Sequence, residues 1–378
     1  MRILFLKPLI LAVVSFFFAQ SFVSAEMTSF SRRMEMLLHS ANYILCIDGG
    51  GTKTAVCLLD KQGRAQVLHW RGVQGSEIRL GASNVNTVGE VGVQRLLEQI
   101  AEIDVTLLTG GQVATSPQSI KSLMPQLGVI AGMSGHSSAE NEPLLTTFFE
   151  AQGLPTGRTI VSGDAGLALN LVDGSGAVLI AGTGSICLGI NGDQRYRSGG
   201  LGWVFGDEGS GYFIGKEAIR SALAYQLGEG VATSLTPVVG SFLKTEFGVD
   251  LPTALLPLYL EGKVRPTQVA KLAPSVFKEA VAGDVVSMQI VDRAARELGD
   301  LLAAVLEDIN EEGSEVYLIG GVFVSDKQAR FIEKMLDSPK AKAALQRLHP
   351  EIKKEALYSN PIEVLVRKYQ NKQLAKAI

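Results

Sequence analysis

A run of glycines that ends in a hydroxyl and a cation carries the clearest chemistry in this chain. The segment Asp48-Gly49-Gly50-Gly51-Thr52-Lys53-Thr54 lies between two apolar stretches. Glycines allow a backbone to approach a ligand closely, and their N–H groups can converge on an anion. Thr52 can donate to a phosphate oxygen, Lys53 can neutralise its charge, and Asp48 can hold a hydrated magnesium ion. A plain glycine-rich hairpin is the alternative. It does not require Thr52 and Lys53, so the segment predicts a phosphate-binding turn.

A second turn of this kind occurs at Ala181-Gly182-Thr183-Gly184-Ser185. By itself it is a weak signal. Its weight comes from the first turn, because two such turns on two lobes can hold a polyphosphate from both sides. Gly320-Gly321 follows another apolar stretch, close to Ser325. This glycine pair allows an adenosine to lie flat against the backbone, although a glycine cap explains it equally well.

Asp164 is the candidate general base. It follows an expected strand at 159–162 and opens the run at 165–171, so we expect it at a strand tip beside a helix N-terminus. Phosphoryl transfer to an alcohol needs a group that accepts the hydroxyl proton, and a positioned aspartate does this in kinases. Aspartate is also a preferred N-cap. Residue type alone leaves these two interpretations evenly balanced.

Several polar residues beside glycines are candidates for binding an acceptor. Asp207 and Glu208 stand in a glycine-flanked segment ahead of an apolar run at 212–224. Acids at a helix start can act as caps, an effect of about 1 kcal/mol, but the flanking glycines favour contact with a flat polar ligand. Asn84, in Gly81-Ala82-Ser83-Asn84, can donate to and accept from vicinal hydroxyls, although Ser-Asn is also a common turn pair. Further candidates for this pocket are Ser134, Gly135, Gly200 and Gly202.

The elements that must position these residues alternate between strands and helices. Apolar runs predict helices at 88–103 and 142–152, and strands at 43–47, 54–59, 66–71, 127–131 and 159–162. A strand at 177–181 and another at 185–190 then repeat the opening unit of strand, glycine turn and strand. Most of 209–309 is helical in pattern, before a last strand at 316–319. The pattern predicts two related α/β lobes.

Composition restricts the class of protein and of ligand. A chain of 378 residues with 46% hydrophobic residues, 19% charged residues and 41 glycines is typical of a folded α/β protein with two domains. A net charge of -3 offers no basic surface for nucleic acid. The three cysteines, Cys46, Cys57 and Cys187, form no CxxC pair and lie in apolar runs. We expect them to be buried thiols rather than disulfides or metal ligands.

The N-terminus conflicts with an ATP-dependent function. Residues 1–25 combine Arg2 and Lys7 with an apolar run and a small-residue site, which is a signal-peptide pattern. Exported proteins do not meet a maintained supply of ATP. Met27, Met34 and Met36 are alternative starts. We expect a cytoplasmic body, with 1–26 as a signal-like or anchor segment outside the fold.

The motifs together resemble a known family. DGGGTKT at 48, SGDAG at 162, AGTGS at 181, GGLGWVFGDEGSGYFIG at 199 and GGVF at 320 are similar to the N-acetylglucosamine kinase and BadF/BadG/BcrA/BcrD ATPase group. That group lies within the sugar kinase, heat-shock protein and actin superfamily. The resemblance spans about residues 43–331 and is most specific at GDEGSGYFIG. The chain departs from the family at Leu201, where many relatives have tryptophan, and at its bulky residues 360–366, where relatives have a small-residue helix.

The resemblance implies two duplicated ribonuclease H-like lobes of the actin-like ATPase type with a cleft between them. We expect a first lobe at 42–172, completed by 361–378, and a second lobe with a helical insertion at 173–360. The resemblance further implies a kinase that uses ATP and Mg²⁺ to phosphorylate a hydroxyl of an amino sugar, such as N-acetylglucosamine. Asp164 would be the base beside the sugar, and Asp207 would hold sugar hydroxyls. A homodimer is left open.

Two other functions remain as alternatives. The first is an ATPase that activates a dehydratase, a role in which cysteines hold an iron–sulfur cluster at a dimer interface. The positions of Cys46, Cys57 and Cys187 within strands argue against that role, so we expect no such cluster. The second is a non-catalytic regulatory protein that binds a sugar or nucleotide. The joint presence of Asp48, Lys53, Asp164 and Asp207 favours the kinase.

Overall fold

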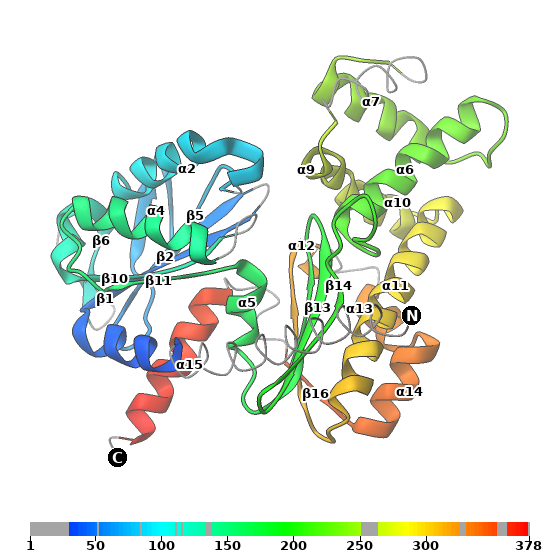
Figure 1. Ribbon diagram of the computed structural model, residues 1–378. Coiled ribbons are helices and arrows are strands. Elements are labelled where there is room, and N and C mark those ends of the chain that lie inside the picture. Colours follow the sequence, from blue (N-terminus) through cyan, green and yellow to red (C-terminus); the bar gives the residue numbers. More distant parts are fainter. Residues whose placement is uncertain are drawn as a thin grey trace, which may run out of the picture. The chain divides into compact units, whose positions relative to one another are not determined.

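The computed structural model describes residues 30–50, 53–83, 85–109, 112–114, 116–133, 138–250, 264–324, 330–353 and 361–376. The chain divides into two compact units, each with its own main sheet and helices (Figure 1). Unit 1 comprises Met1–Leu171, Asn191–Arg195 and Asn360–Ile378, and unit 2 comprises Val172–Ile190 and Tyr196–Ser359. The expected signal-like segment at 1–26 lies outside the described residues. Within the described residues, no helix has both the length and the apolar character needed to span a membrane.

The main sheet of unit 1 has five strands in the order β11-β10-β1-β2-β5. β1 (Tyr43–Gly49) pairs antiparallel with β2 (Thr54–Asp60), which pairs antiparallel with β5 (Glu77–Leu80). On its other side, β1 pairs parallel with β10 (Leu127–Met133), and β10 pairs parallel with β11 (Thr159–Ser162). The carboxyl ends of these parallel strands meet at one edge of the sheet, which is where ligands bind in open α/β sheets.

Alternate residues of β1 serve the two faces of this sheet. Leu45 and Ile47 belong to a core that also contains residues of α2 (Val85–Ala101) and α4 (Ser138–Ala151). The last helix of the chain, α15 (Pro361–Lys376), contacts β1, β10 and α5 (Asp164–Leu169). It buries Ile362, Leu365 and Val366. The C-terminal helix is therefore an integral part of unit 1.

A smaller sheet in unit 1 has the order β4-β3-β6-β9. Its strands are β3 (Val67–Trp70), β4 (Val73–Gly75), β6 (Asp104–Thr106) and β9 (Gln118–Ser119). A hairpin of β7 (Leu108–Thr109) and β8 (Gln112–Val113) and the short helices α3 (Ile120–Leu123) and η1 (Met124–Gln126) accompany it. The sequence predicted only the first of these strands, because the others are too short to show a period.

Residues 30–40 form a helix that the sequence analysis did not predict. The segment is rich in charged and polar residues, which makes its apolar positions less evident in the sequence. These positions, Met34, Leu37, Leu38 and Ala41, have helical spacing and are buried. Leu37 packs against Gly128 of β10, where a Cβ atom would lie 2.6 Å from the leucine side chain. This helix is part of unit 1, so the described fold begins before residue 42.

Met34→Ala is expected to lower the free energy of unfolding by about 2–5 kcal/mol, because it leaves a cavity at a fully buried site. Met36→Ala is the matched control. The Met36 side chain is 72% exposed, so its removal should change the free energy of unfolding by less than about 0.5 kcal/mol. Chemical denaturation of both variants measures the difference. Equal midpoints would show that the helix contributes nothing to the fold. A chain started at Met36 should be destabilised as well.

The sheet of unit 2 has the order β14-β13-β12-β15-β16. Its strands are β12 (Ser175–Ala181), β13 (Ser185–Asn191), β14 (Gln194–Gly199), β15 (Glu315–Ile319) and β16 (Glu351–Lys353). β15 pairs parallel with β12, and β16 pairs parallel with β15. Counted along each unit, both main sheets therefore follow the order third, second, first, fourth and fifth strand. The predicted α/β class with two lobes of related topology is confirmed.

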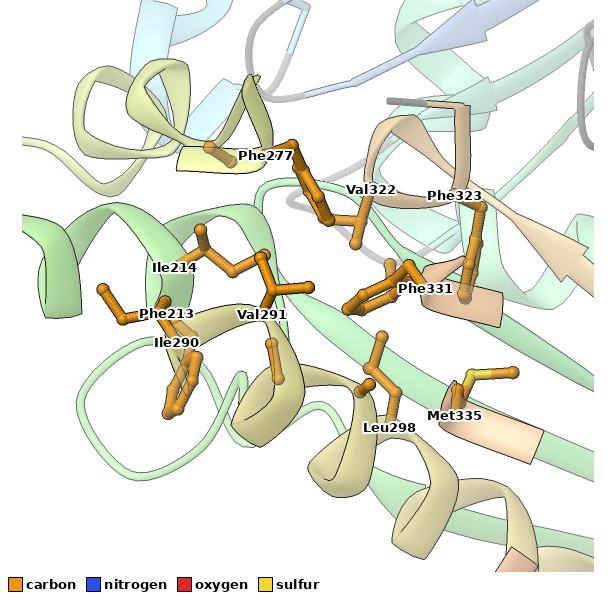
Figure 2. Close-up of a cluster of buried hydrophobic side chains, with 14 of the residues drawn as sticks. Phe213, Ile214, Phe277, Ile290, Val291, Leu298, Val322, Phe323, Phe331 and Met335 are labelled. Carbon is orange, nitrogen blue, oxygen red and sulfur yellow. The ribbon is translucent and has the colours of Figure 1, made fainter. Parts of the chain in front are cut away.

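The core of unit 2 is built around one long helix, α11 (Val285–Ile309). It contacts α6 (Gly211–Gln226), α10 (Ala273–Val281), α13 (Phe331–Leu336), α14 (Pro339–Leu348) and β12. Figure 2 shows Phe331 in the middle of this cluster, with ring centroids 5.3 Å from Phe277 and 6.3 Å from Phe323. The remaining helices are α7 (Leu235–Phe247), α9 (Pro266–Val269), η2 (Ala270–Leu272) and α12 (Gly321–Val324). This core holds α6, whose N-terminus meets the second glycine turn.

Candidate functional site

One register row crosses all five strands of the main sheet of unit 1. From edge to edge, the paired residues are Arg79, Ala55, Asp48, Gly132 and Ser162. In the parallel strands, this row lies at or one residue before the carboxyl end. Asp48, predicted as the magnesium ligand, therefore stands in the middle of the edge where a ligand is expected.

Asp164 lies at the same edge, two residues after Ser162. It is the first residue of α5, and the N-cap is Gly163, which makes no side-chain capping bond. The N-cap role considered for this aspartate is thus taken by a glycine. The backbone therefore puts Asp164 two residues beyond the row that contains Asp48. The side chain of Asp164 lies outside what the structure describes.

The first glycine turn is tied to the segment that contains the predicted sugar-binding asparagine. Within the turn, the Gly50 N–H donates to the Lys53 carbonyl at 2.9 Å. The Ser83 N–H donates to the Gly50 carbonyl at 3.2 Å, and the Thr54 hydroxyl donates to the Gly81 carbonyl at 2.8 Å. These bonds fix residues 81–83 against the turn. Gly51, Thr52 and Asn84 lie outside the described residues.

Ser83 is a residue of this site that the sequence analysis did not single out. It is 1% exposed, and its hydroxyl is buried without a hydrogen-bond partner in the described part of the chain. Gly49 leaves the room for it: a Cβ atom there would overlap the Ser83 hydroxyl and lie 2.6 Å from the Met133 sulfur. A buried polar atom without a partner costs free energy. A bound ligand or water could provide the hydrogen bond that the Ser83 hydroxyl lacks.

Four charged residues lie within electrostatic range of one another beside the first turn. The partial dehydration of its ammonium group lowers the pKa of Lys53, and the nearby Arg79 guanidinium lowers it further. Glu77 and then Asp48 act in the opposite direction. The net effect of these groups is a lowered pKa for Lys53. Such a perturbed group is typical of functional sites.

The surroundings of Asp48 limit where a metal can lie. Asp48 lines a void of about 10 Å³ together with Gly132, α5 and the first residues of α15, Pro361 and Ile362. That volume is close to the smallest that holds one water, so the void itself does not fit a hydrated magnesium ion. Among the described residues, no three metal-ligating side chains cluster. Magnesium, however, commonly binds through one or two carboxylates with waters and substrate phosphates, which a single Asp48 satisfies.

The second glycine turn is held by the N-terminus of α6. The Gly182 N–H donates to the Gly184 carbonyl at 2.9 Å and closes the turn. The first N–H groups of α6 donate to its carbonyls: Gly211 to Gly182 at 2.8 Å and Tyr212 to Thr183 at 3.1 Å. Those carbonyls satisfy helix donors that otherwise lack partners. The turn thus has a fixed conformation supported by the core of unit 2.

The side chain of Asp207 contacts the second glycine turn. Its carboxylate accepts a hydrogen bond from the Ser185 N–H at 3.2 Å, and a Cβ atom on Gly184 would lie 2.7 Å from the same carboxylate. The backbone of Asp207 has φ 62°, a conformation that costs free energy outside glycine. Burial raises the pKa of Asp207, the Ser185 N–H lowers it, and Glu208 raises it. The predicted sugar-binding acid and the predicted nucleotide turn are therefore neighbours within unit 2.

Two further glycine segments reach the same part of unit 2. Gly320, at the end of β15, has φ 119°, and a Cβ atom there would lie 2.6 Å from the Ala181 carbonyl carbon. The Gly200 N–H donates to the Ser185 carbonyl at 2.9 Å. Gly202 is less closely held, since a Cβ atom there would meet nothing within 4 Å.

The predicted site residues thus fall into two groups. Unit 1 brings together Asp48, Gly50, Lys53 and the backbone of Asp164, and unit 2 brings together Gly182, Thr183, Gly184, Gly200, Asp207 and Gly320. Ser134, Gly135 and Ser325 lie outside the described residues. Cys46 and Cys57 are buried free thiols opposite each other on β1 and β2, and Cys187 is a buried free thiol of β13.

Comparison with known proteins agrees with this arrangement. The chain is 32% identical over 311 residues to the N-acetylmuramic acid/N-acetylglucosamine kinase of Clostridium acetobutylicum, covering 79% of this chain and 92% of that protein. It is 30% identical over 298 residues to the N-acetyl-D-glucosamine kinase of Dictyostelium discoideum, covering 74% and 83%. A solved structure from Chromobacterium violaceum, provisionally named an N-acetylglucosamine kinase, has the same fold, with a TM-score of 0.56 at 22% identity over 87% of this chain and 99% of that one. The model of the BadF/BadG/BcrA/BcrD ATPase family matches residues 45–353, so the chain belongs to that family.

Proposed function

We propose that this protein is an ATP-dependent kinase that phosphorylates a hydroxyl of an amino sugar, with N-acetylglucosamine or a closely related hexosamine as acceptor. The observation that carries the proposal is the edge of the unit 1 sheet, where one row contains Asp48, the glycine turn follows it, and Asp164 stands two residues past the row's end. Relatives named for kinases of N-acetylglucosamine, N-acetylmuramic acid and glucosamine support the acceptor class.

In this proposal, different residues of the chain bind the phosphates, accept the proton and orient the sugar. The glycine turns at 50–53 and 182–184 present backbone N–H groups to phosphates, and Lys53 adds a positive charge. Asp164 takes the proton of the acceptor hydroxyl. Asp207, with Asn84, Ser134, Gly135, Gly200 and Gly202, orients the sugar. When bound, MgATP would supply the phosphoryl group, and Asp48 is the residue that would hold its magnesium ion.

Features of the structure fit such a cofactor. Gly50 and Gly182 lie in turns closed by their own hydrogen bonds, and a Cβ atom on Gly182 would meet nothing within 4 Å, so the backbone there is open to a close ligand. Beside the first turn, partial dehydration and then the Arg79 guanidinium lower the pKa of Lys53, while Glu77 and Asp48 act in the opposite direction. A phosphate group bound at the first turn would favour the charged form of Lys53 by direct attraction.

A panel of hexoses, hexosamines and N-acetylated sugars tests the proposal. With MgATP, we expect at least one N-acetylated or free hexosamine to stimulate ADP release well above the rate with glucose. Lys53→Ala should raise the KM for MgATP by roughly 10-fold, because it removes one charge-assisted contact. No stimulation by any sugar, together with retained nucleotide binding, would favour the non-catalytic regulatory protein instead.

The setting of the reaction follows from its substrates. We place the protein in the cytoplasm, because that compartment supplies MgATP. We assign no oligomeric state. Recovery of a form beginning at Glu26 from outside the cell would contradict this location. The dehydratase-activating role is disfavoured because Cys46 and Cys57 are buried in unit 1 and Cys187 is buried in unit 2.

A further inference from the structure

Arg79 occupies an unexpected place beside the first glycine turn. It lies on β5, the edge strand of the main sheet of unit 1, directly opposite Ala55, which in turn lies opposite Asp48. Directly paired residues of antiparallel strands point to the same face. Strands are about 4.8 Å apart, so Arg79 lies two strands away from Asp48, with the buried Ala55 between them.

The neighbours of Arg79 along its strand show which face it occupies. Ile78 and Leu80 belong to the core beneath α2 and α4. Arg79 and Glu77 therefore point to the other face, because side chains alternate along a strand. Arg79 is 64% exposed on that face, and its Nε donates to Glu77 at 2.8 Å.

An exposed ion pair of this kind contributes little to stability, so stability alone does not account for the position of Arg79. Arg79 is also close enough to Lys53 to lower the pKa of that lysine, while Glu77 and Asp48 raise it. A phosphate group near Arg79 and Lys53 would be attracted to both cations. A guanidinium suits this role because its fork can bind two phosphate oxygens at once.

We propose that Arg79 is a second polyphosphate-binding cation, which acts with Lys53 at the first glycine turn and exchanges Glu77 for a phosphate group when nucleotide binds. Glu77 then competes with the nucleotide phosphate for the Arg79 guanidinium. This inference rests on the proposed function for its biological meaning. The chemistry itself requires only a polyphosphate.

The test compares three single variants by steady-state kinetics with MgATP. Arg79→Gln should raise the KM for MgATP by roughly 10-fold, with kcat within about twofold of wild type, because it removes a binding contact. Arg79→Lys should recover part of that loss. Glu77→Gln should lower the KM by about two- to threefold, because it frees the guanidinium.

Opposite effects of the Arg79 and Glu77 variants are the decisive result. A merely structural ion pair would make both variants behave alike, and equal effects or no effect on KM would overturn the inference. Arg64→Gln is the matched control, because Arg64 also pairs with an acid, Asp60, at 2.7 Å, at the other end of β2. It should leave the KM unchanged.

Calorimetric titration with inorganic tripolyphosphate separates this inference from the proposed function. Arg79→Gln should weaken tripolyphosphate binding about as much as it raises the KM, even in a chain that phosphorylates no sugar. Unchanged tripolyphosphate binding in Arg79→Gln would overturn the role of Arg79 and leave the kinase assignment intact. If the wild-type chain phosphorylated no sugar while Arg79→Gln still bound tripolyphosphate more weakly, the kinase assignment would fall and the role of Arg79 would stand.

Discussion

Asp164→Asn is expected to lower kcat by at least roughly 10²-fold while leaving the affinities for MgATP and sugar close to wild type. Removal of a general base costs about this much. Asparagine has nearly the size of aspartate but does not accept the hydroxyl proton. Because Gly163 rather than Asp164 is the N-cap of α5, the substitution removes no side-chain cap, and the stability of unit 1 should change little.

A true capping aspartate provides the control for this variant. Asp284 is the N-cap of α11 and accepts a hydrogen bond from the Ser287 N–H at 2.7 Å. Asp284→Ala should lower the free energy of unfolding by about 1–2 kcal/mol and leave kcat unchanged. Asp164→Asn should show the opposite pattern. Steady-state assays with N-acetylglucosamine and MgATP measure kcat for both variants, and thermal unfolding measures their stability. Together they distinguish a general base from a helix cap. A wild-type kcat for Asp164→Asn would remove this residue from the chemistry.

The parts of the fold that the sequence predicted correctly are those with local signals. The strands on either side of each glycine turn were found because apolar runs and glycines follow one another directly in sequence. β1 and β2 were predicted at 43–47 and 54–59 and are observed at Tyr43–Gly49 and Thr54–Asp60. The repetition of this unit led to the prediction of two related lobes, which the matching strand orders confirm.

The parts that the sequence did not predict depend on distant contacts. Arg79 has no motif around it, and its place beside Lys53 comes from the pairing of β2 with β5. Asp207 was predicted at a helix start, but its position on Gly184 depends on the docking of α6 against the turn. The helix at 30–40 was missed because its charged residues were given more weight than the buried spacing of Met34, Leu37 and Leu38.

Gly320→Ala is expected to lower the free energy of unfolding by about 2–6 kcal/mol, the widest stability range that we predict. Two costs combine. With φ 119°, an alanine at this position adopts a conformation that costs about 1–3 kcal/mol. Its Cβ atom would also overlap the backbone of Ala181 on the neighbouring strand β12, where overpacking costs typically about 1–3 kcal/mol. A backbone group in a sheet moves less easily than a flexible side chain, so little relief is available.

Gly321→Ala separates the two roles that the sequence left open for this glycine pair. A Cβ atom on Gly321 would meet nothing within 4 Å, so the variant should unfold at the wild-type temperature. If an adenosine lies flat against this backbone, the added methyl should weaken MgATP binding by roughly 10-fold, which corresponds to a loss of about 1.4 kcal/mol of binding free energy. Thermal unfolding and MgATP titration of both variants measure the two effects separately. Full nucleotide affinity in a stable Gly321→Ala would show that the pair serves the fold alone: Gly320 to let β15 pass close to β12, and Gly321 only to begin α12.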